Sequence, residues 1–168
     1  MPKHTISVER VRELLDYDPA SGLFHWKAKS ARRTIVGSQA GYPEWNGYIR
    51  IGIGGRIYFA HVVAWLLVHG DWPKSQLDHI NGNRADNRIE NLREATARQN
   101  ARNRKTRRDN IARLKGVCVR PCKTKPYQAV ICEDGRRISL GYFETKEAAH
   151  AVYCTAASNL FAEFSRTE

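Results

Sequence analysis

The chain has 168 residues and a formal net charge of +11, from 28 Lys and Arg against 17 Asp and Glu. With 42% hydrophobic residues it can build buried cores, so we do not expect wholesale disorder, and its length suits one domain or two or three small modules. The polar N-terminus lacks the apolar segment of a signal peptide, and the longest apolar run, 62–68, is too short to span a bilayer. We therefore expect a cytoplasmic protein with no membrane association, free cysteines and a polyanionic partner.

The positive charge is concentrated in the middle of the chain. Residues 74–113 hold 11 Lys and Arg against 5 Asp and Glu, which is more than half of the net charge. A block of like charge between two structured segments repels itself unless a partner neutralises it, and nucleic acid phosphates are the usual neutraliser. Residues 98–113 contain a single acidic residue, Asp109, and the basic residues Arg98, Arg102, Arg104, Lys105, Arg107, Arg108 and Arg113.

The first part of the chain, residues 1–73, is predicted to be a small α+β segment without catalytic residues. We interpret His25, His61 and His69 as structural, because a lone histidine at a strand or helix junction is more often structural than reactive. The expected elements are a helix over 7–16 with Ser7 as N-cap, a turn over 18–22, a strand over 23–26, a loop over 28–41, a hairpin of 48–53 and 56–60 turned at Gly54 and Gly55, and a helix over 61–70 ended by Gly70.

The second part, residues 74–104, predicts a strand, a loop, a second strand and a helix. The strands are expected over 77–80 and 88–93, and Thr96 with Gln99 matches a capping box at the start of the helix.

Oxygen-bearing side chains dominate this part, and they favour one kind of metal. A single His and no Cys argue against zinc. An EF-hand is excluded because Asn83 stands at its glycine position and Ile89 at the position of its bidentate Glu. Carboxylate and amide oxygens instead suit Mg²⁺, or Mn²⁺ in its place.

The spacing of four residues resembles the HNH nuclease motif. Asp78 and His79 are followed by Asn91 twelve residues after His79, and by Asn100 nine further. The pattern is similar to the branch with a leading Asp and a final Asn that is seen in phage homing endonucleases. The resemblance extends from 61–65 to Asn100 and is most specific over 78–83 and 87–92. It implies a ββα-metal core that hydrolyses phosphodiester bonds in double-stranded DNA.

The resemblance also implies a role for each matched residue. His79 would be the general base, since an imidazole can take a proton from water at neutral pH. Asp78 and Asn100 would hold one Mg²⁺ or Mn²⁺ per active site, and Asn91 would support the loop and orient His79. Because neighbouring residues of a regular strand face opposite sides, we expect a twist or bulge at Asp78 and His79.

A basic linker, 105–113, leads to the third part, residues 114–168. Its order is three strands and a helix that Thr145 caps. The strands are expected over 115–121, 127–132 and 136–143, and the apolar stripe of the helix at Ala148, Ala149, Val152, Ala156 and Leu160.

This third part resembles the AP2 DNA-binding domain, which lays a three-stranded sheet in the major groove. Gly116-Val117, 140–143, Thr145 and 147–149 carry the resemblance. Arg120 and Arg137 match positions that contact DNA in that family. At four positions where that family usually has Arg or Trp, this chain has Cys118, Cys122, Cys132 and Ser139. We therefore expect its preference for particular DNA sequences to be low or differently encoded. The spacing of the cysteines matches zinc sites poorly.

Together these patterns predict an α+β, metal-dependent, homing-type DNA endonuclease with no small-molecule cofactor. Such nucleases are typically phage- or intron-encoded. Because each chain has one active site, the simpler expectation is a monomer that nicks one strand. The alternative is a DNA-binding regulator of AP2 type with an inactive nuclease core, which the intact motif disfavours. An RNA-binding protein is a third class, but neither an RNP aromatic pattern nor a KH loop is present.

Overall fold

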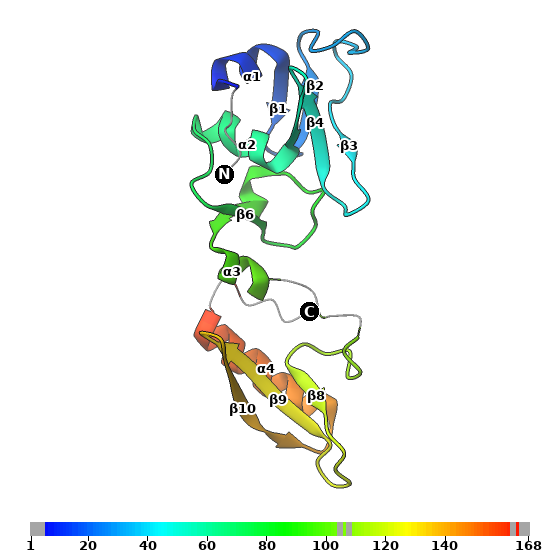
Figure 1. Cartoon of the computed structure of the whole chain (residues 1–168), viewed down its shortest axis with the longest axis vertical. Helices are drawn as coiled ribbons and strands as arrows, with labels where there is room; N and C mark the ends of the chain where they lie inside the picture. Colours follow the sequence, from blue (N-terminus) through cyan, green and yellow to red (C-terminus); the bar gives the residue numbers. More distant parts are fainter. Residues whose placement is uncertain (1–5, 104–105, 107–108, 162–163, 165–168) are drawn as a thin grey trace. The chain divides into compact units, whose positions relative to one another are not determined.

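The computed structural model describes residues 6–103, 106, 109–161 and 164, which form two compact units (Figure 1). The N-terminal unit spans Met1–Asn100 and the C-terminal unit Ala101–Glu168. Each mixes helices with small antiparallel sheets, which confirms the predicted α+β class. Every helix in the described ranges is too short or too polar to cross a lipid bilayer.

The N-terminal unit is built from small antiparallel sheets and the helices beside them. Its sheets pair β1 with β2, β3 with β4 and β5, and β6 with β7. The elements are α1 (Val8–Leu14), β1 (Leu15–Asp18), β2 (Leu23–Trp26), β3 (Tyr42–Pro43), β4 (Ile49–Ile53), β5 (Arg56–Phe59), α2 (Ala60–His69), β6 (Gln76–His79), the 3-10 helix η1 (Ile89–Asn91), β7 (Leu92–Ala95) and α3 (Ala97–Arg102).

Helix α1 begins as predicted but ends earlier. The Ser7 hydroxyl accepts a hydrogen bond from the backbone N–H of Arg10 at 3.3 Å, which caps the helix. The helix stops at Leu14 because Leu15–Asp18 forms a strand that pairs with Leu23–Trp26 across the predicted turn. The predicted helix end at residue 16 is therefore wrong.

The hairpin of β4 and β5 and the helix α2 form the centre of the unit. The hairpin turns at Gly54 and Gly55, as predicted. Helix α2 ends at Gly70, whose left-handed backbone (φ 77°) lets its N–H bond to the carbonyl of Leu66. Ile51 of β4 and Val63 of α2 are fully buried in the same core, which holds these elements together.

The second strand of segment 74–104 is shifted from its predicted position. Instead of a strand over 88–93, the chain makes the turn η1 and then β7. The N–H of Arg88 bonds to the Asp86 carboxylate and the N–H of Asn91 to the Arg88 carbonyl, so local bonds replace the ladder there. Leu92 of β7 lies in the core formed by α1, β2, β4 and α2, so the predicted segments 1–73 and 74–104 share one core.

In the described residues that follow α3, the C-terminal unit has an α-helix on a three-stranded sheet, as predicted. The strand order is β10-β9-β8, and the elements are β8 (Val117–Val119), β9 (Tyr127–Glu133), β10 (Arg136–Phe143) and α4 (Lys146–Phe161). Thr145 accepts a hydrogen bond from the N–H of Ala148, which confirms the predicted cap.

The buried face of α4 differs from the predicted stripe. The buried residues are Ala149, Tyr153, Ala157 and Phe161, whereas Val152 and Leu160 are exposed. Both sets recur every four residues, so periodicity alone does not separate them. The set with the two aromatic side chains covers the sheet, where Ala129 and Ile131 of β9 are buried.

Candidate active site

Asp78 and His79 are adjacent in β6, and both are buried. The exposed fractions are 5% for Asp78 and 4% for His79. Strand β6 pairs with β7 in a regular register, with Asp78 opposite Arg93 and His79 opposite Leu92. All residues of this strand pair are described, and its register contains no bulge, which was one of the two distortions predicted there. The two side chains therefore point to opposite faces of the strand.

His79 lies in a small group of aromatic and amide side chains. Its Nε2 is 3.4 Å from the Oδ1 of Asn87, and its ring centroid is 5.0 Å from that of His61 in an edge-on arrangement. The ring of Tyr48 lies 5.9 Å away, measured between centroids. Burial lowers the pKa of His79, and this outweighs the opposing effects of Asn87 and Asp78. The imidazole is therefore neutral at neutral pH, which is the form a general base needs.

Asn87 is a residue of this site that the sequence analysis missed. It is 3% exposed, and its amide Nδ2 donates to the carbonyl of Ala85 at 3.2 Å, which turns Oδ1 toward His79. The hydroxyl of Tyr17 donates to the Asn87 carbonyl at 2.8 Å. Asn87 belongs to one of the two most specific runs of the motif, so its position within that run was the available signal.

Asn91 supports the loop rather than touching His79. Its Oδ1 accepts from the N–H of Asn81 at 3.0 Å, and its Nδ2 donates to the carbonyl of Asp86 at 2.8 Å. These bonds close the loop 81–87 that follows β6. The structure thus places Asn91 as a loop brace, and the contact with His79 that was predicted for it is made by Asn87 instead.

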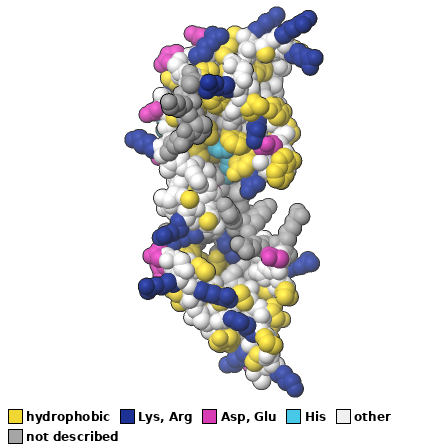
Figure 2. Space-filling model, in the orientation of Figure 1, with side chains coloured by type: hydrophobic (Ala, Val, Ile, Leu, Met, Phe, Trp, Pro, Cys, Tyr) yellow, Lys and Arg dark blue, Asp and Glu magenta, His cyan; other side chains and the backbone are white. Residues whose placement is uncertain are grey.

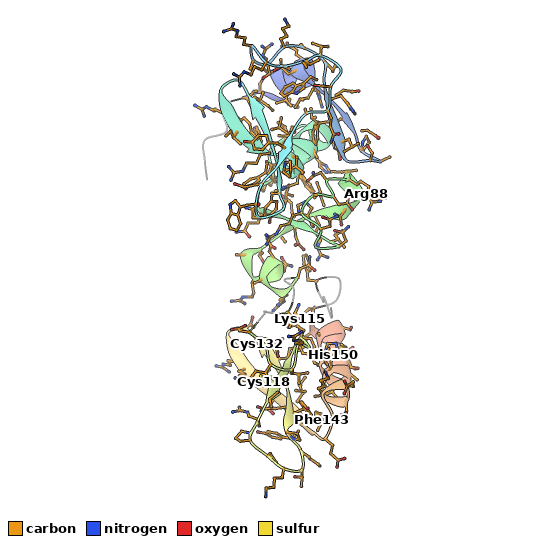
Figure 3. The ribbon with its side chains drawn as sticks, turned by 90° about the vertical axis from the view of Figure 1, so that its right-hand side faces the viewer. Arg88, Lys115, Cys118, Cys132, Phe143 and His150 are labelled. Carbon is orange, nitrogen blue, oxygen red and sulfur yellow. The ribbon has the colours of Figure 1, made fainter. Side chains whose placement is uncertain are left out.

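The loop 81–87 is held in place from inside and from outside. The Asp86 carboxylate accepts bonds from Arg88 and from Asn81, and these contacts, those of Arg88 above all, lower the pKa of Asp86 to about 2. Figure 3 marks Arg88 beside this loop. The turn at Gly22 packs directly on the loop, since a Cβ there would lie 2.5 Å from the backbone nitrogen of Arg88. The N-terminal elements therefore fix the loop that carries Asn87.

Asp78 and Asn100 lie toward the same face of β6. Arg93 donates to the Oδ2 of Asp78 from its Nε at 3.1 Å and from a terminal nitrogen at 2.9 Å. The amide Nδ2 of Asn100 donates to the Oε1 of Gln76 at 3.2 Å. Gln76 and Asp78 are two residues apart on a regular strand and share a face, so Asn100 lies on the side that carries Asp78.

These donors suit a hard cation. One carboxylate and one amide oxygen offer the oxygen ligands that Mg²⁺ prefers, and Mg²⁺ commonly keeps waters and substrate oxygens in its remaining positions. Helix α3 starts at the predicted capping box, in which the N–H of Thr96 donates to Gln99 and the N–H of Gln99 to Thr96. That cap determines where Asn100 enters the helix. Within the described ranges, no group of three or more His, Cys, Asp and Glu could hold a metal ion.

Some of the basic residues predicted to bind DNA are described in the structure and others are not. Arg104, Lys105, Arg107 and Arg108 lie outside the described residues. Arg98 is exposed on α3, and the guanidinium of Arg102 stacks 4.0 Å from the ring centroid of Phe161.

Arg120 and Arg137 lie on the face of the C-terminal sheet away from α4. Arg120 donates to the Oε1 of Gln128 at 2.9 Å, and Arg137 contacts the sulfur of Cys118 at 3.1 Å. Gln128 alternates along β9 with Ala129, which is buried against the helix, so these contacts belong to the opposite face.

The four cysteines are free thiols. Figure 3 shows Cys118 and Cys132 on the sheet and His150 on α4 beside Lys115. The Nδ1 of His150 is 2.9 Å from the Lys115 carbonyl, and its Nε2 is 3.4 Å from the sulfur of Cys154.

His61 makes the stability of the N-terminal unit depend on pH. Its side chain is 7% exposed, its Nδ1 has no hydrogen-bond partner among the described residues, and burial lowers its pKa from 6.5 to about 3. Between pH 6.5 and about 3, the imidazole of His61 is therefore protonated in the unfolded chain but not in the folded chain. The contribution of neutral His61 to the unfolding free energy is fully present above pH 6.5 and is lost as the pH is lowered through this window.

Because of His61, we expect the unfolding free energy to fall by about 2 kcal/mol when the pH is lowered from 7 to 5. Urea unfolding followed by tryptophan fluorescence measures it, because all four tryptophans lie in the N-terminal unit. His61→Phe, which keeps an aromatic ring without a titrating group, should flatten this dependence. Equal pH slopes in the two proteins would contradict the assignment.

The comparisons with known proteins agree with the motif. A family model described as HNH endonuclease matches residues 58–102. An uncharacterized HNH endonuclease of Acanthamoeba polyphaga mimivirus is 30% identical over 132 residues, which cover 78% of this chain and 67% of that protein. Protein 3.8 of Escherichia phage T7 is 38% identical over 58 residues, which cover 34% of this chain and 48% of that protein. No solved structure matches the chain. The matched region contains His61, Asp78, His79, Asn91 and Asn100, and the chain therefore belongs to the HNH endonuclease family.

Proposed function

We propose that the protein is a metal-dependent DNA endonuclease in which His79 is the general base and Asp78 and Asn100 hold one Mg²⁺ or Mn²⁺. The observation that carries the proposal is the buried His79 at the end of β6, oriented by Asn87 and adjacent to Asp78, within the region that the family model matches. The finer proposal is a homing-type enzyme that acts in a host cytoplasm, and it rests on the resemblance of the motif; the two relatives are viral proteins.

In this proposal, the contacts of His79 determine which nitrogen takes the proton. The Oδ1 of Asn87 can only accept a hydrogen bond, so it favours the tautomer with hydrogen on the Nε2 of His79. The Nδ1 then carries the lone pair that removes a proton from the attacking water. Tyr48 and His61 limit rotation of the ring by packing against it.

Asp78, which precedes His79 at the end of β6, and Asn100 would supply oxygen ligands to the cation. Arg93 contacts the Asp78 carboxylate with two nitrogens and so restricts its rotation. When bound, the cation supplies stabilisation of the charge that develops on the scissile phosphate and the leaving 3′ oxygen.

The C-terminal unit would bind the double-stranded DNA, as the AP2 resemblance implies. Two exposed arginines, Arg120 and Arg137, stand on the open face of its sheet. Gln128 orders this face, because its Nε2 donates to the Ser139 hydroxyl at 2.9 Å and to the Tyr142 hydroxyl at 3.3 Å. Lys and Arg side chains stand on the surface of both units (Figure 2), which suits a partner that is a polyanion along its whole length.

A plasmid cleavage assay tests the proposal. Supercoiled DNA should be converted to the open circular form in Mg²⁺ or Mn²⁺, and excess EDTA should prevent the conversion. A monomer with one active site nicks one strand, so the open circle should precede the linear form. Strand-specific labels on a short duplex then identify the strand that is cut. DNA binding without cleavage in every divalent cation would instead support a DNA-binding regulator.

A further inference from the structure

Trp45 is a large apolar side chain that the fold leaves in solvent. It is 94% exposed, the highest value among the exposed large hydrophobic residues in the described ranges. Trp45 stands in the turn 44–47 between β3 and β4, which we call the β3–β4 tip. Exposure of an indole on a folded protein gives up the burial energy that an aromatic side chain offers, so packing does not explain a tryptophan there.

The β3–β4 tip is well ordered by its own hydrogen bonds. The N–H of Glu44 donates to the Tyr48 carbonyl and the N–H of Gly47 to the Glu44 carbonyl, both at 2.8 Å. Asn46 donates to the Glu44 carboxylate at 2.9 Å and accepts from the N–H of Tyr48 at 3.1 Å. Arg50 forms an ion pair with Glu44 at 2.6 Å. Trp45 is thus presented on a preorganised turn, which reduces the entropy lost when the indole binds a partner.

The tip is joined to the loop of the candidate active site. Arg84 of that loop donates to the Asn46 carbonyl at 2.9 Å, and its guanidinium lies 4.8 Å from the centroid of the Tyr48 ring. The Tyr48 ring in turn lies against His79. Trp45 and Tyr48 are three residues apart, so their Cα atoms are at most about 11 Å from each other. The tip that carries Trp45 therefore adjoins the loop and the aromatic ring that lie beside His79.

We infer that Trp45 contacts the DNA substrate, with its indole packed against the apolar face of a nucleotide beside the cleaved bond. The inference rests on the proposed function. In a duplex the base faces are stacked on one another, so the indole would reach them as an apolar wedge at a base step, and the sugars offer further apolar surface. The cationic Arg84 is exposed beside the tip and suits the phosphates of the same strand. The acidic Glu44 is already paired with Arg50, so it opposes DNA less than a free carboxylate would.

Binding of a short duplex in EDTA, where no cleavage is expected, tests the inference on the full chain. Trp45→Ala should weaken binding about tenfold, and Trp45→Phe should keep most of the affinity. Ile35→Ala is the matched control, because Ile35 is 71% exposed on a loop of the same unit and should not change binding. The indole is uncharged, so the slope of log Kd against log salt should be the same with and without it.

A fluorescent base identifies the contact. With 2-aminopurine placed beside the cleaved bond, wild type should change the emission of the probe on binding, and Trp45→Ala should bind at higher concentration without that change. Equal affinity and equal probe emission for wild type and Trp45→Ala would overturn the inference, as would a dimer that Trp45→Ala dissociates with no loss of DNA affinity. Wild type that binds but never cleaves would overturn the proposed function alone, and wild type that binds no DNA would overturn both.

Discussion

His79→Ala should lower the rate of DNA cleavage by roughly 10²–10⁴-fold, which is the usual contribution of a positioned general base. The expectation follows from the place of the imidazole at the end of β6, where Asn87, His61 and Tyr48 fix its orientation. DNA affinity should be little changed, because a side chain that is 4% exposed offers DNA almost no contact surface. Single-turnover cleavage at saturating protein, with Kd measured separately in EDTA, separates the two effects.

The control must distinguish lost chemistry from lost structure, because removal of a buried ring leaves a cavity. His79→Gln keeps much of the volume and the polarity but has no basic nitrogen, so it should be folded and nearly as inactive as His79→Ala. His25→Ala removes an exposed imidazole from β2 of the same unit and should cleave like wild type. Wild-type cleavage by folded His79→Gln would show that another group takes the proton.

Asp78→Asn and Asn100→Ala should each abolish cleavage at ordinary Mg²⁺ concentrations. Asp78→Asn removes the single charged ligand proposed for the cation, and Asn100→Ala removes the neutral oxygen ligand. Asp78→Asn is a better test than Asp78→Ala, because asparagine keeps an oxygen that can accept a hydrogen bond from Arg93, whose side chain is 12% exposed, whereas alanine removes that acceptor. Cleavage rate is measured against Mg²⁺ and Mn²⁺ concentration.

A conservative change at Asn100 sharpens this prediction. Asn100→Asp keeps an oxygen at the same position, so it should retain metal-dependent cleavage while Asn100→Ala does not. Asp71→Asn removes an exposed carboxylate elsewhere in the same unit and should leave the metal dependence unchanged. Full activity of wild type in excess EDTA, or unchanged activity of both Asp78→Asn and Asn100→Ala, would refute the proposed metal site.

Some active-site contacts were beyond sequence analysis because they join residues far apart in the chain. Tyr17 donates to the carbonyl of Asn87, seventy residues later, and the turn at Gly22 packs on the backbone of Arg88. His61 was interpreted as an ordinary structural histidine, and only the packing of α2 beside β6 brings its ring to His79. Such partners depend on how the sheets and helices pack, which short-range patterns do not specify.

The sequence by itself determined the features that depend on neighbours along the chain. The caps at Ser7, Thr96 and Thr145 are set by bonds across three residues, and the HNH motif by the order and spacing of its residues. Only the tertiary structure decided which residues of α4 are buried, because two apolar stripes have the same period and the sheet selects the one that it covers. It also decided that Asn87, rather than Asn91, contacts His79, because the bonds of Asn91 are used to close the loop from which Asn87 reaches the imidazole.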